Sequence, residues 1–307
     1  RVIVDTTVQE KAVAYPTDSR LLEVGRKKLV MLAKRHGIAL RQSYEREGPR
    51  LSRRAGGYAH AKQFKRMKRV LRRQRTLLGR VIRDIGRKLD GADAGARETL
   101  QPWLQRAQRL YAQHRNDKGK LYALHAPEVE CIGKGKARTP YEFGVKVSIA
   151  TTLKEGLVVG MRSMPGNPYD GHTLAETLEQ VGILTGTDRP PATAIVDKGY
   201  RGVKVEGVRI LMSGQKRGIT RTLKAMIKRR NAIEPAIGHM KMDGRLGRNP
   251  LKGALGDALH AVMCGAGHNL RLILAALRLL CARFGLTMQA LISALLAAPV
   301  DHRPVCG

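Results

Sequence analysis

Three acidic residues of this 307-residue chain are spaced so that they could act on one chemical step. They are Asp5, after the apolar run 2–4, Asp197, after the apolar run 194–196, and Glu234, within a basic segment. Carboxylates at the ends of two strands and on a helix can hold a pair of Mg²⁺ ions, because Mg²⁺ prefers a few hard oxygen ligands and leaves its other positions to water and phosphate. Such a site supports in-line displacement at the phosphorus of a phosphodiester.

Each carboxylate also has an ordinary structural explanation. An Asp after a strand is commonly a turn former or a helix cap, which covers Asp5 and Asp197. Glu234 can simply pair with Arg230 one helical turn earlier, since side chains four residues apart touch on a helix. The prediction of chemistry therefore depends on the three acids taken together, on their elements and on the charge of the chain.

The charge of the chain is its most unusual bulk property. There are 57 Lys and Arg against 25 Asp and Glu, a formal net charge of +32, while 43% of the residues are apolar, enough for a folded core. A folded domain this basic is expected to bind nucleic acid, because neutralising phosphates releases condensed counterions. An anionic membrane is a weaker candidate, since no run reaches the ~20 apolar residues that span a bilayer and no basic amphipathic helix lies at either end.

The four cysteines are widely scattered, with no Cys-x-x-Cys pair and no matching His spacing. This argues against a zinc site and against a disulfide framework, and it fits a reduced, cytoplasmic setting. The chain begins with Arg1 inside a strand pattern and shows no signal-peptide pattern, so we expect that upstream sequence is missing.

The first part of the chain has a helical pattern. After a strand at 1–4 and a capping loop at 15–18, apolar periodicity predicts helices at 19–36, 58–88 and 94–115. Residues 41–88 hold seventeen Lys and Arg and three acids, with one apolar side and the rest cationic. We interpret residues 17–125 as one basic, all-helical block.

The pattern changes to period two after Pro127. It predicts a hairpin of strands 141–149 and 156–161, a helix at 172–184, strands at 193–196 and 208–212, a helix at 220–242 that Pro235 kinks or restarts, and two apolar helices within 258–298. With the helical block set aside, this order predicts an α/β fold with a ribonuclease-H-like mixed sheet. A structureless loop of about 100 residues is implausible in such a core. We therefore predict a catalytic core of residues 1–16 plus 126–257, a basic helical insertion after the first strand at 17–125, and a helical C-terminus at 258–307.

The sequence around the three acids resembles the DDE transposases of bacterial insertion sequences, in particular the IS-five group. Four stretches carry the resemblance: 4–9 (VDTTVQ), 197–202 (DKGYRG), 230–234 (RNAIE) and 238–241 (GHMK). Arg230, Glu234 and Lys241 match the R-E-K spacing of that family. The family usually places a Tyr three residues before this Arg, where this chain has Ile227. The similarity spans nearly the whole chain, but the region that precedes the first catalytic strand in the family has no counterpart here.

The resemblance implies that Asp5, Asp197 and Glu234 are the catalytic, metal-binding triad and hold two Mg²⁺ ions, for which Mn²⁺ can substitute. Water would first cut DNA at the ends of the element, and the resulting 3′-OH would then attack target DNA. The implied partner is double-stranded DNA, both terminal inverted repeats and target, bound by a homodimer. The implied location is the bacterial cytoplasm, in association with the nucleoid.

Several basic residues are predicted to contact DNA. Arg230 and Lys241 lie along the predicted catalytic helix, and Lys198, Tyr200 and Arg201 lie beside Asp197. The one-sided charge of the helical block adds a surface that includes Lys65, Arg66, Arg69, Arg72 and Arg73. The alternative for Arg230 and Lys241 is ordinary solvated helix charge.

Two other functions remain open at the level of sequence. One is an inactive or domesticated transposase remnant that binds DNA. The other is a ribonuclease-H-like nuclease that acts on structured or guided nucleic acid. Metal-dependent nicking distinguishes the first from an active transposase, and competition between DNA and structured RNA distinguishes the second.

Overall fold

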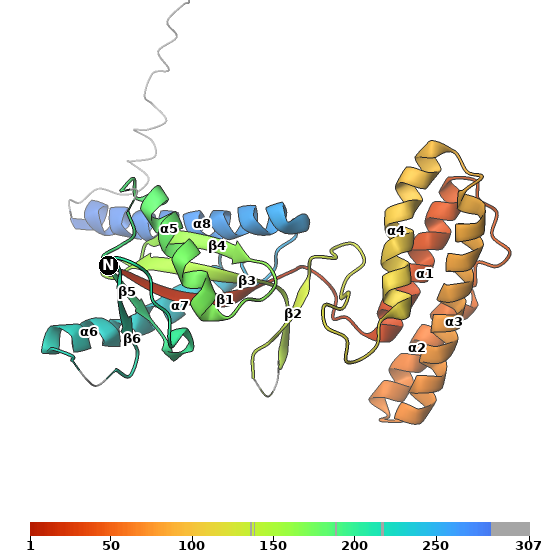
Figure 1. The fold of residues 1–307 in the computed structure, drawn as a ribbon, viewed down its shortest axis with the longest axis horizontal. Coiled ribbons are helices and arrows are strands. Elements are labelled where there is room, and N and C mark those ends of the chain that lie inside the picture. Colours follow the sequence, from red (N-terminus) through yellow and green to blue (C-terminus); the bar gives the residue numbers. More distant parts are fainter. Residues whose placement is uncertain (136, 138, 188, 216–217, 284–307) are drawn as a thin grey trace, which may run out of the picture.

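The computed structural model describes residues 1–283 except 136, 138, 188 and 216–217, and it contains an α/β part and a bundle of four helices (Figure 1). The strands are β1 (Val2–Glu10), β2 (Glu130–Gly133), β3 (Tyr141–Thr152), β4 (Val158–Met164), β5 (Thr193–Val196) and β6 (Arg209–Met212). The helices are α1 (Asp18–Arg35), α2 (Glu47–His60), α3 (Phe64–Leu89), α4 (Ala94–Ala112), α5 (Leu174–Leu184), α6 (Arg221–Arg229), α7 (Ile233–Met242) and α8 (Gly253–Arg283). Three short 3₁₀ turns are η1 (Asp170–Thr173), η2 (Lys198–Tyr200) and η3 (Arg230–Ala232).

The described strands form one mixed sheet in the order β2-β3-β1-β5-β6, with β4 also paired to β3. The long strand β3 is antiparallel to β1, to β2 and to β4, whereas β5 is parallel to both β1 and β6. A sheet with three antiparallel strands at one side and parallel strands at the other is compatible with the ribonuclease-H-like arrangement predicted above.

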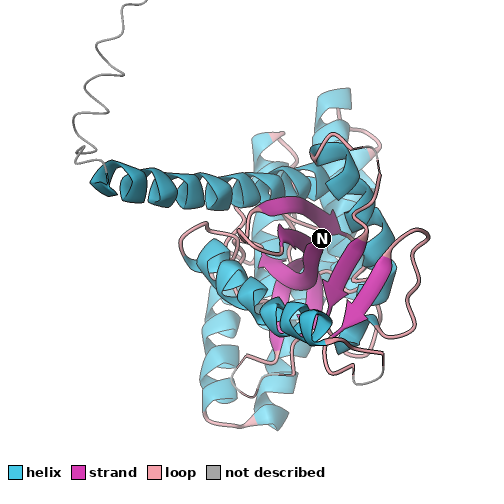
Figure 2. Cartoon of the chain, turned by 90° about the vertical axis from the view of Figure 1, so that its left-hand side faces the viewer, coloured by secondary structure: helices cyan, strands magenta, loops and turns pink. Residues whose placement is uncertain are grey.

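Helices cover both faces of this sheet. Helix α5 packs on one face, where Leu174 and Leu178 meet Val4 and Val196. Helices α7 and α8 pack on the other face, where Met240 and other apolar residues of α7 and α8 meet β3 and β4. The second half of α8 projects beyond the sheet (Figure 2), and its leucines are exposed there.

The four helices α1–α4 lie between β1 and β2 in the chain and form their own core. Helices α1, α3 and α4 share a cluster of buried apolar residues, and α2 packs on α3 through Leu51 and Leu77. The Thr17 side chain accepts a hydrogen bond from the Arg20 backbone N–H and caps α1, as the loop 15–18 predicted. The single tryptophan, Trp103, packs against this core, also as predicted.

The first strand is longer than predicted. We expected it to end at Val4 with Asp5 at its exit, but β1 continues to Glu10 and Asp5 lies in its middle. The residues that follow, Thr6, Thr7 and Val8, are β-branched and favour a strand. Their backbone pairs with β3 along its whole length, so the ladder continues past the first acid.

The helices differ from the prediction in the bundle and at the C-terminal end of the described chain. The segment 58–88 is not one helix, because α2 ends at His60 and α3 begins at Phe64, with Lys62 in the left-handed region at φ 55° between them. Helix α2 itself was not predicted. At the C-terminal end, α8 begins at Gly253, earlier than the predicted start at 258, and runs to Arg283; residues 284–298 lie outside the described part of the chain, so the expectation of two helices within 258–298 stays a prediction.

Candidate active site

The parallel pairing of β1 with β5 brings two of the predicted catalytic acids to the same level of the sheet. Ile3 lies opposite Ile195 in this ladder, and two residues further on the chain reaches Asp5 within β1 and Asp197 directly after the end of β5, where the backbone is still extended. Side chains two positions apart point to the same face of a sheet. Both carboxylates therefore share the face of Ile3 and Ile195, which α6 and the start of α7 cover.

Arg230 lies at the centre of the three acids. Its Nη2 donates to Asp5 Oδ2 at 2.7 Å and lies 3.9 Å from Asp197 Oδ2, while its Nη1 donates to Glu234 Oε1 at 3.1 Å. The Arg230 side chain is 12% exposed, and its buried Nε has no hydrogen-bond partner among the described residues. One guanidinium thus faces all three carboxylates, and only its contact with Glu234 follows from helical spacing.

The three carboxylates differ in their exposure to solvent. The side chains of Asp5, Asp197 and Glu234 are 15%, 36% and 63% exposed, so Asp5 is the innermost. Burial raises the pKa of Asp5, and the neighbouring acids add to this effect, whereas Arg230 and the Thr6 backbone N–H, which donates to Asp5 Oδ1 at 2.8 Å, only partly oppose it. The Asp197 Oδ1 atom accepts a hydrogen bond from the Gly199 N–H at 2.7 Å.

The local structure around Glu234 places it beside the sheet. Helix α6 ends at Arg229, the turn η3 follows, and α7 begins at Ile233, whose side chain is buried against β1 and β5. Pro235 lies in the first turn of α7, where its missing N–H has no helical partner to lose. The helix therefore restarts just before Pro235, as the sequence predicted, and Arg230 and Glu234 lie one turn apart.

Asp170 is a candidate residue that the sequence analysis missed. Its Oδ1 accepts hydrogen bonds from the Thr6 hydroxyl at 2.9 Å and from Lys146 Nζ at 2.8 Å. A Cβ atom on Gly199 would lie within 3.5 Å of carboxylate oxygens of both Asp170 and Asp197, so the two acids flank this glycine. The only sequence signal is an acid at the start of a helix, which is also an ordinary dipole-compensating position.

Tyr200 is not at the surface, which corrects the prediction that it contacts DNA. Its side chain is 1% exposed and packs in the core with β1, β5 and α5. Burial, and after it the Asp5 and Asp170 carboxylates, raises the pKa of its phenol. The Tyr200 hydroxyl is buried, and an interaction with the Thr173 side chain partly opposes the rise in its pKa.

The other basic residues predicted beside the acids are closer to solvent. Lys198 and Arg201 are exposed on either side of Tyr200. Lys241 is half-buried, with its Nζ 3.4 Å from Glu142 Oε2. Contact of these side chains with DNA stays a prediction.

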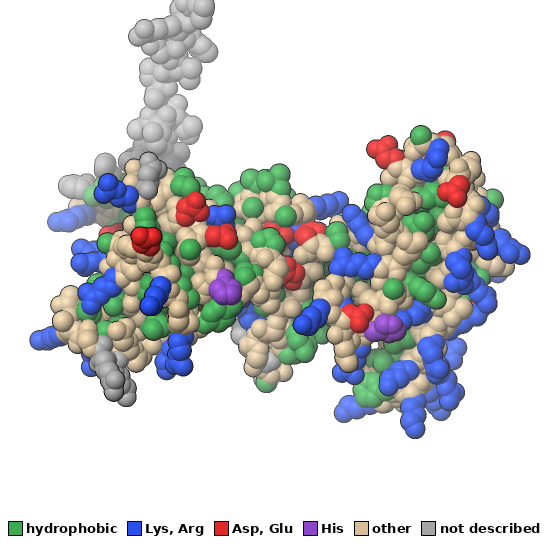
Figure 3. All heavy atoms as spheres, in the orientation of Figure 1, with side chains coloured by type: hydrophobic (Ala, Val, Ile, Leu, Met, Phe, Trp, Pro, Cys, Tyr) green, Lys and Arg blue, Asp and Glu red, His purple; other side chains and the backbone are tan. Residues whose placement is uncertain are grey.

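The basic residues predicted on the helical block lie on α3. The exposed residues of this set are Lys65, Arg66, Arg69, Arg72 and Arg73. Arg73 donates to both carboxylate oxygens of Glu47, at 2.7 and 3.0 Å, across to α2. Figure 3 shows Lys and Arg side chains gathered over the bundle, at a distance from the acids of the sheet.

The carboxylate groups of the three acids are suitable ligands for a divalent cation, but their present arrangement is not that of a metal site. In the described part of the chain, no three His, Cys, Asp or Glu side chains are close enough together to hold a metal ion. The Arg230 guanidinium lies between the carboxylates, in the position where a cation would balance their charge. Carboxylate oxygens are nevertheless the hard donors that Mg²⁺ and Mn²⁺ take, so the residues fit such an ion if Arg230 moves aside.

Comparison with known proteins agrees with this geometry. The family model "Transposase DDE domain" matches residues 114–270, about half of the chain. The chain therefore belongs to the DDE transposase family. The matched segment contains Asp197, Arg230, Glu234 and Asp170, whereas Asp5 lies before it.

One curated relative is 61% identical to this chain over 64 residues, which are 21% of this chain and 31% of the relative. It is "Uncharacterized protein ORF8 in nfe locus" from Rhizobium meliloti, and the match spans about a third of its length. No solved structure matches the chain. Among the described helices, none is both long enough and apolar enough to cross a membrane.

Proposed function

We propose that this chain is the catalytic core of an insertion-sequence transposase, which cuts DNA at the ends of the element and joins the 3′-OH to target DNA. The observation that supports this most directly is the convergence of Asp5, Asp197 and Glu234 on Arg230 at one point of a mixed sheet. The family of the chain supports the same chemistry.

In this proposal the three acids bind two divalent cations, Mg²⁺ or Mn²⁺. The support is that the DDE transposase family, to which the chain belongs, generally uses divalent metals. Such ions, when bound, would activate the attacking oxygen and stabilise the leaving oxygen of the phosphodiester. The position of Asp5 within β1 and of Asp197 at the end of β5 sets the separation of two ligands, and Glu234, at the exposed rim, is free to adjust. Arg230 keeps the acids together before any cation arrives, and its guanidinium is suited to bind the phosphate.

Asp170 completes the environment of the site as a positioning residue. Its bond to Thr6 ties the start of α5 to the strand that carries Asp5, and its pairing with Lys146 ties it to β3. Because Asp170 also flanks Gly199, it restricts where the η2 turn after Asp197 can lie. We expect it to hold the two aspartates in their relative position.

The proposed DNA path runs from the acids to the helical bundle. Lys198 and Arg201 are exposed beside Asp197, and Lys241 follows Glu234 on α7. The exposed basic residues at the start of α3 would hold a more distant part of the duplex. The net charge of +32 supports a polyanionic partner that reaches from the acids to the bundle.

The domain organisation belongs to the same proposal. Residues 1–16 plus 126–257 would form a ribonuclease-H-like core and residues 17–125 an inserted DNA-binding bundle; the separate C-terminus predicted from residue 258 is not supported, because α8 crosses that boundary and packs on the sheet through Ala261 and Cys264. The separate cores of the sheet and the bundle support this division. Bringing two element ends together calls for a homodimer on DNA.

The decisive experiment is Mg²⁺-dependent nicking and joining of a labelled duplex that carries the element's own ends, with Asp197→Asn as the comparison. We expect activity in the wild type and none in the variant, with DNA affinity kept. Tight binding without cleavage by the wild type, in Mg²⁺ and in Mn²⁺, would instead identify a DNA-binding remnant. Preference for structured RNA over the element ends would identify a nuclease of the same fold.

A further inference from the structure

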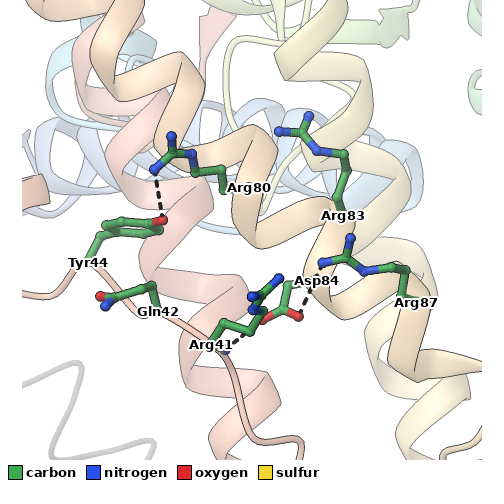
Figure 4. Close-up of a pocket in the computed structure, with 7 residues that line it drawn as sticks. All are labelled: Arg41, Gln42, Tyr44, Arg80, Arg83, Asp84 and Arg87. Atoms are coloured by element: carbon green, nitrogen blue, oxygen red, sulfur yellow. Dashed lines mark hydrogen bonds and ion pairs between the residues drawn. The ribbon is translucent and has the colours of Figure 1, made fainter.

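A basic pocket lies in the helical bundle, away from the acids of the sheet. Its cavity volume is about 390 Å³, and it is bounded by α3 and by the segment that follows α1 (Figure 4). The lining residues are Arg41, Gln42, Tyr44, Arg80, Arg83, Asp84 and Arg87. Four of the seven are arginines, and Figure 4 shows their side chains around one opening.

The single acid of the pocket is already neutralised. Asp84 Oδ2 accepts the Arg41 backbone N–H at 2.7 Å, and its Oδ1 lies 3.0 Å from Lys88 Nζ and 3.6 Å from Arg87 Nη2. Burial alone would raise the pKa of Asp84, but the Arg41 N–H, Lys88 and Arg87 together lower it. These groups favour the charged form of the carboxylate, and the pocket keeps an excess of positive charge.

Three of the four guanidinium groups of the pocket, those of Arg41, Arg80 and Arg83, form no ion pair with any described residue, whereas Arg87 lies 3.6 Å from Asp84. Arg80 makes one long contact, 3.4 Å to the Tyr44 hydroxyl. The side chains of Arg41 and Arg83 have neither a hydrogen bond nor an ion pair with any described residue, and all of these arginines are exposed. Like charges held together in this way oppose folding, so an anionic ligand would stabilise the arrangement.

The pocket is one end of a longer arginine stripe along α3. Arg80, Arg83 and Arg87 are three and four residues apart, which places them on one face of the helix. The same face continues back toward the start of α3 through Arg73, Arg69 and Arg66, also exposed. From Arg66 to Arg87 the stripe spans roughly 32 Å at the helical rise of about 1.5 Å per residue, which is close to the ~34 Å of one turn of duplex DNA.

We propose that Arg41, Arg80, Arg83 and Arg87 bind backbone phosphates of duplex DNA, at one end of the stripe that starts at Arg66. Guanidinium forks match phosphate oxygens in geometry and charge, and a lining this cationic excludes apolar and cationic ligands. The linear extension of the stripe favours a duplex over a small anion. The choice of DNA as the source of phosphate rests on the proposed function. The inference that the pocket binds phosphate groups rests on its arginines and is independent of that function.

The test compares two triple variants that each remove three positive charges. The pocket variant is Arg80→Gln/Arg83→Gln/Arg87→Gln, and the control is Arg97→Gln/Arg115→Gln/Lys118→Gln, whose positions are exposed and do not line the pocket. Binding of a labelled duplex of about 30 base pairs, roughly three helical turns, is measured over a range of salt concentrations. Thermal melts by circular dichroism check that both variants fold.

We expect the pocket variant to bind DNA at least about tenfold more weakly and to show a salt slope shallower by about 2.7, since three phosphate contacts are lost and each removes about 0.9 from the slope. The control should keep both the wild-type affinity and slope. Equal losses in the two variants would mean that only net charge matters and would overturn the site. An unchanged pocket variant would overturn it as well.

Two further arms identify the source of the phosphate. A duplex RNA of the same sequence that competes as well as the DNA would overturn the assignment to DNA. Inorganic phosphate that raises the melting temperature of the wild type but not of the pocket variant, with DNA binding equal in both, would show a small-anion site instead. DNA cleavage with a divalent metal is measured in parallel. If the wild type binds DNA but never cuts it, only the proposed function is refuted. If the pocket variant binds and cuts DNA normally, only the role of the pocket in DNA binding is refuted.

Discussion

Replacing Arg230 by Gln should destabilise the α/β part of the molecule in the absence of divalent cations. The substitution keeps a polar side chain of similar length but removes the one positive charge, among the residues that the structure describes, that faces Asp5, Asp197 and Glu234 together. The three carboxylates would then repel one another, and Asp5, the innermost, would lose its ion pair.

The magnitude follows from the burial of each pair. Removing one partner of a fully buried ion pair costs about 3–5 kcal/mol, and the Arg230–Asp5 pair is close to that limit, with side chains 12% and 15% exposed. The exposed contact with Glu234 adds only about 0.3–0.5 kcal/mol. Protonation of Asp5, whose pKa is already raised, limits the loss, so we expect about 2–4 kcal/mol at neutral pH.

The assay should report on the sheet rather than on the bundle. Trp103, the only tryptophan, packs in the bundle, so its fluorescence would miss the effect. Hydrogen exchange of the β1 and β5 amides, read by mass spectrometry, measures the relevant opening free energy. The Arg229→Gln variant is the matched control, because that side chain is exposed and donates only to the carbonyls of Leu153 and Lys154.

Magnesium should reverse much of the Arg230→Gln defect, because a cation that binds the folded site stabilises it by mass action. We therefore expect slower exchange of β1 and β5 in the variant when Mg²⁺ is added, and a smaller Mg²⁺ effect in the wild type, where the guanidinium already balances the charge. Exchange in the variant equal to that of the Arg229→Gln control, with and without Mg²⁺, would refute the role given to Arg230.

Three other substitutions test separate parts of the structure. Asp5→Asn should abolish cleavage yet leave the protein at least as stable at neutral pH. Because the pKa of Asp5 is raised in the folded state, its contribution to folding stability is greatest below the unfolded pKa and is lost as pH rises through the folded pKa. A variant whose stability, measured by urea titration, still falls with pH as in the wild type would contradict this role of Asp5. Asp170→Asn should slow cleavage while DNA affinity is kept, and wild-type rates in a nicking assay would remove its positioning role. Gly144→Ala should destabilise the sheet by at least about 1–3 kcal/mol, because its Cβ would clash with the Gln9 carbonyl oxygen; Gly133→Ala, with open space around it, is the control, and equal melting temperatures would refute the clash.

Periodic patterns in the sequence predicted which helices and strands form better than they predicted where each one begins and ends. Strand β5 was predicted at its observed bounds, because a β-branched Thr and three apolar residues between turn signals have few alternatives. The length of β1 was not predicted, since continuation past Asp5 depends on pairing with β3, which is more than a hundred residues away in the chain. The break at Lys62 depends on one left-handed residue inside a run with helical periodicity.

The acids of the site were identifiable from local sequence, whereas their environment was not. Asp197 and Glu234 lie in short motifs whose spacing is visible in the chain. The contact of Arg230 with Asp5 joins residues 225 positions apart, and the bond of Asp170 to Thr6 joins residues 164 apart. Tyr200 was assigned to DNA because of its neighbours, but the apolar surface available under β5 determines its burial.

The position of the bundle between β1 and its partners has a consequence for the order of events during synthesis. Roughly 130 residues separate the end of β1 from the start of β3, and closing a flexible loop of that length costs about 4 kcal/mol in chain entropy, apart from a constant. The contacts within α1–α4 are local and can form as soon as these helices emerge, which shortens the effective loop. We therefore expect β1 to leave the ribosome before the bundle and to remain unpaired while the bundle folds behind it. During that interval the buried apolar residues of β1 are exposed, and this nascent strand is the segment where a chaperone would be needed.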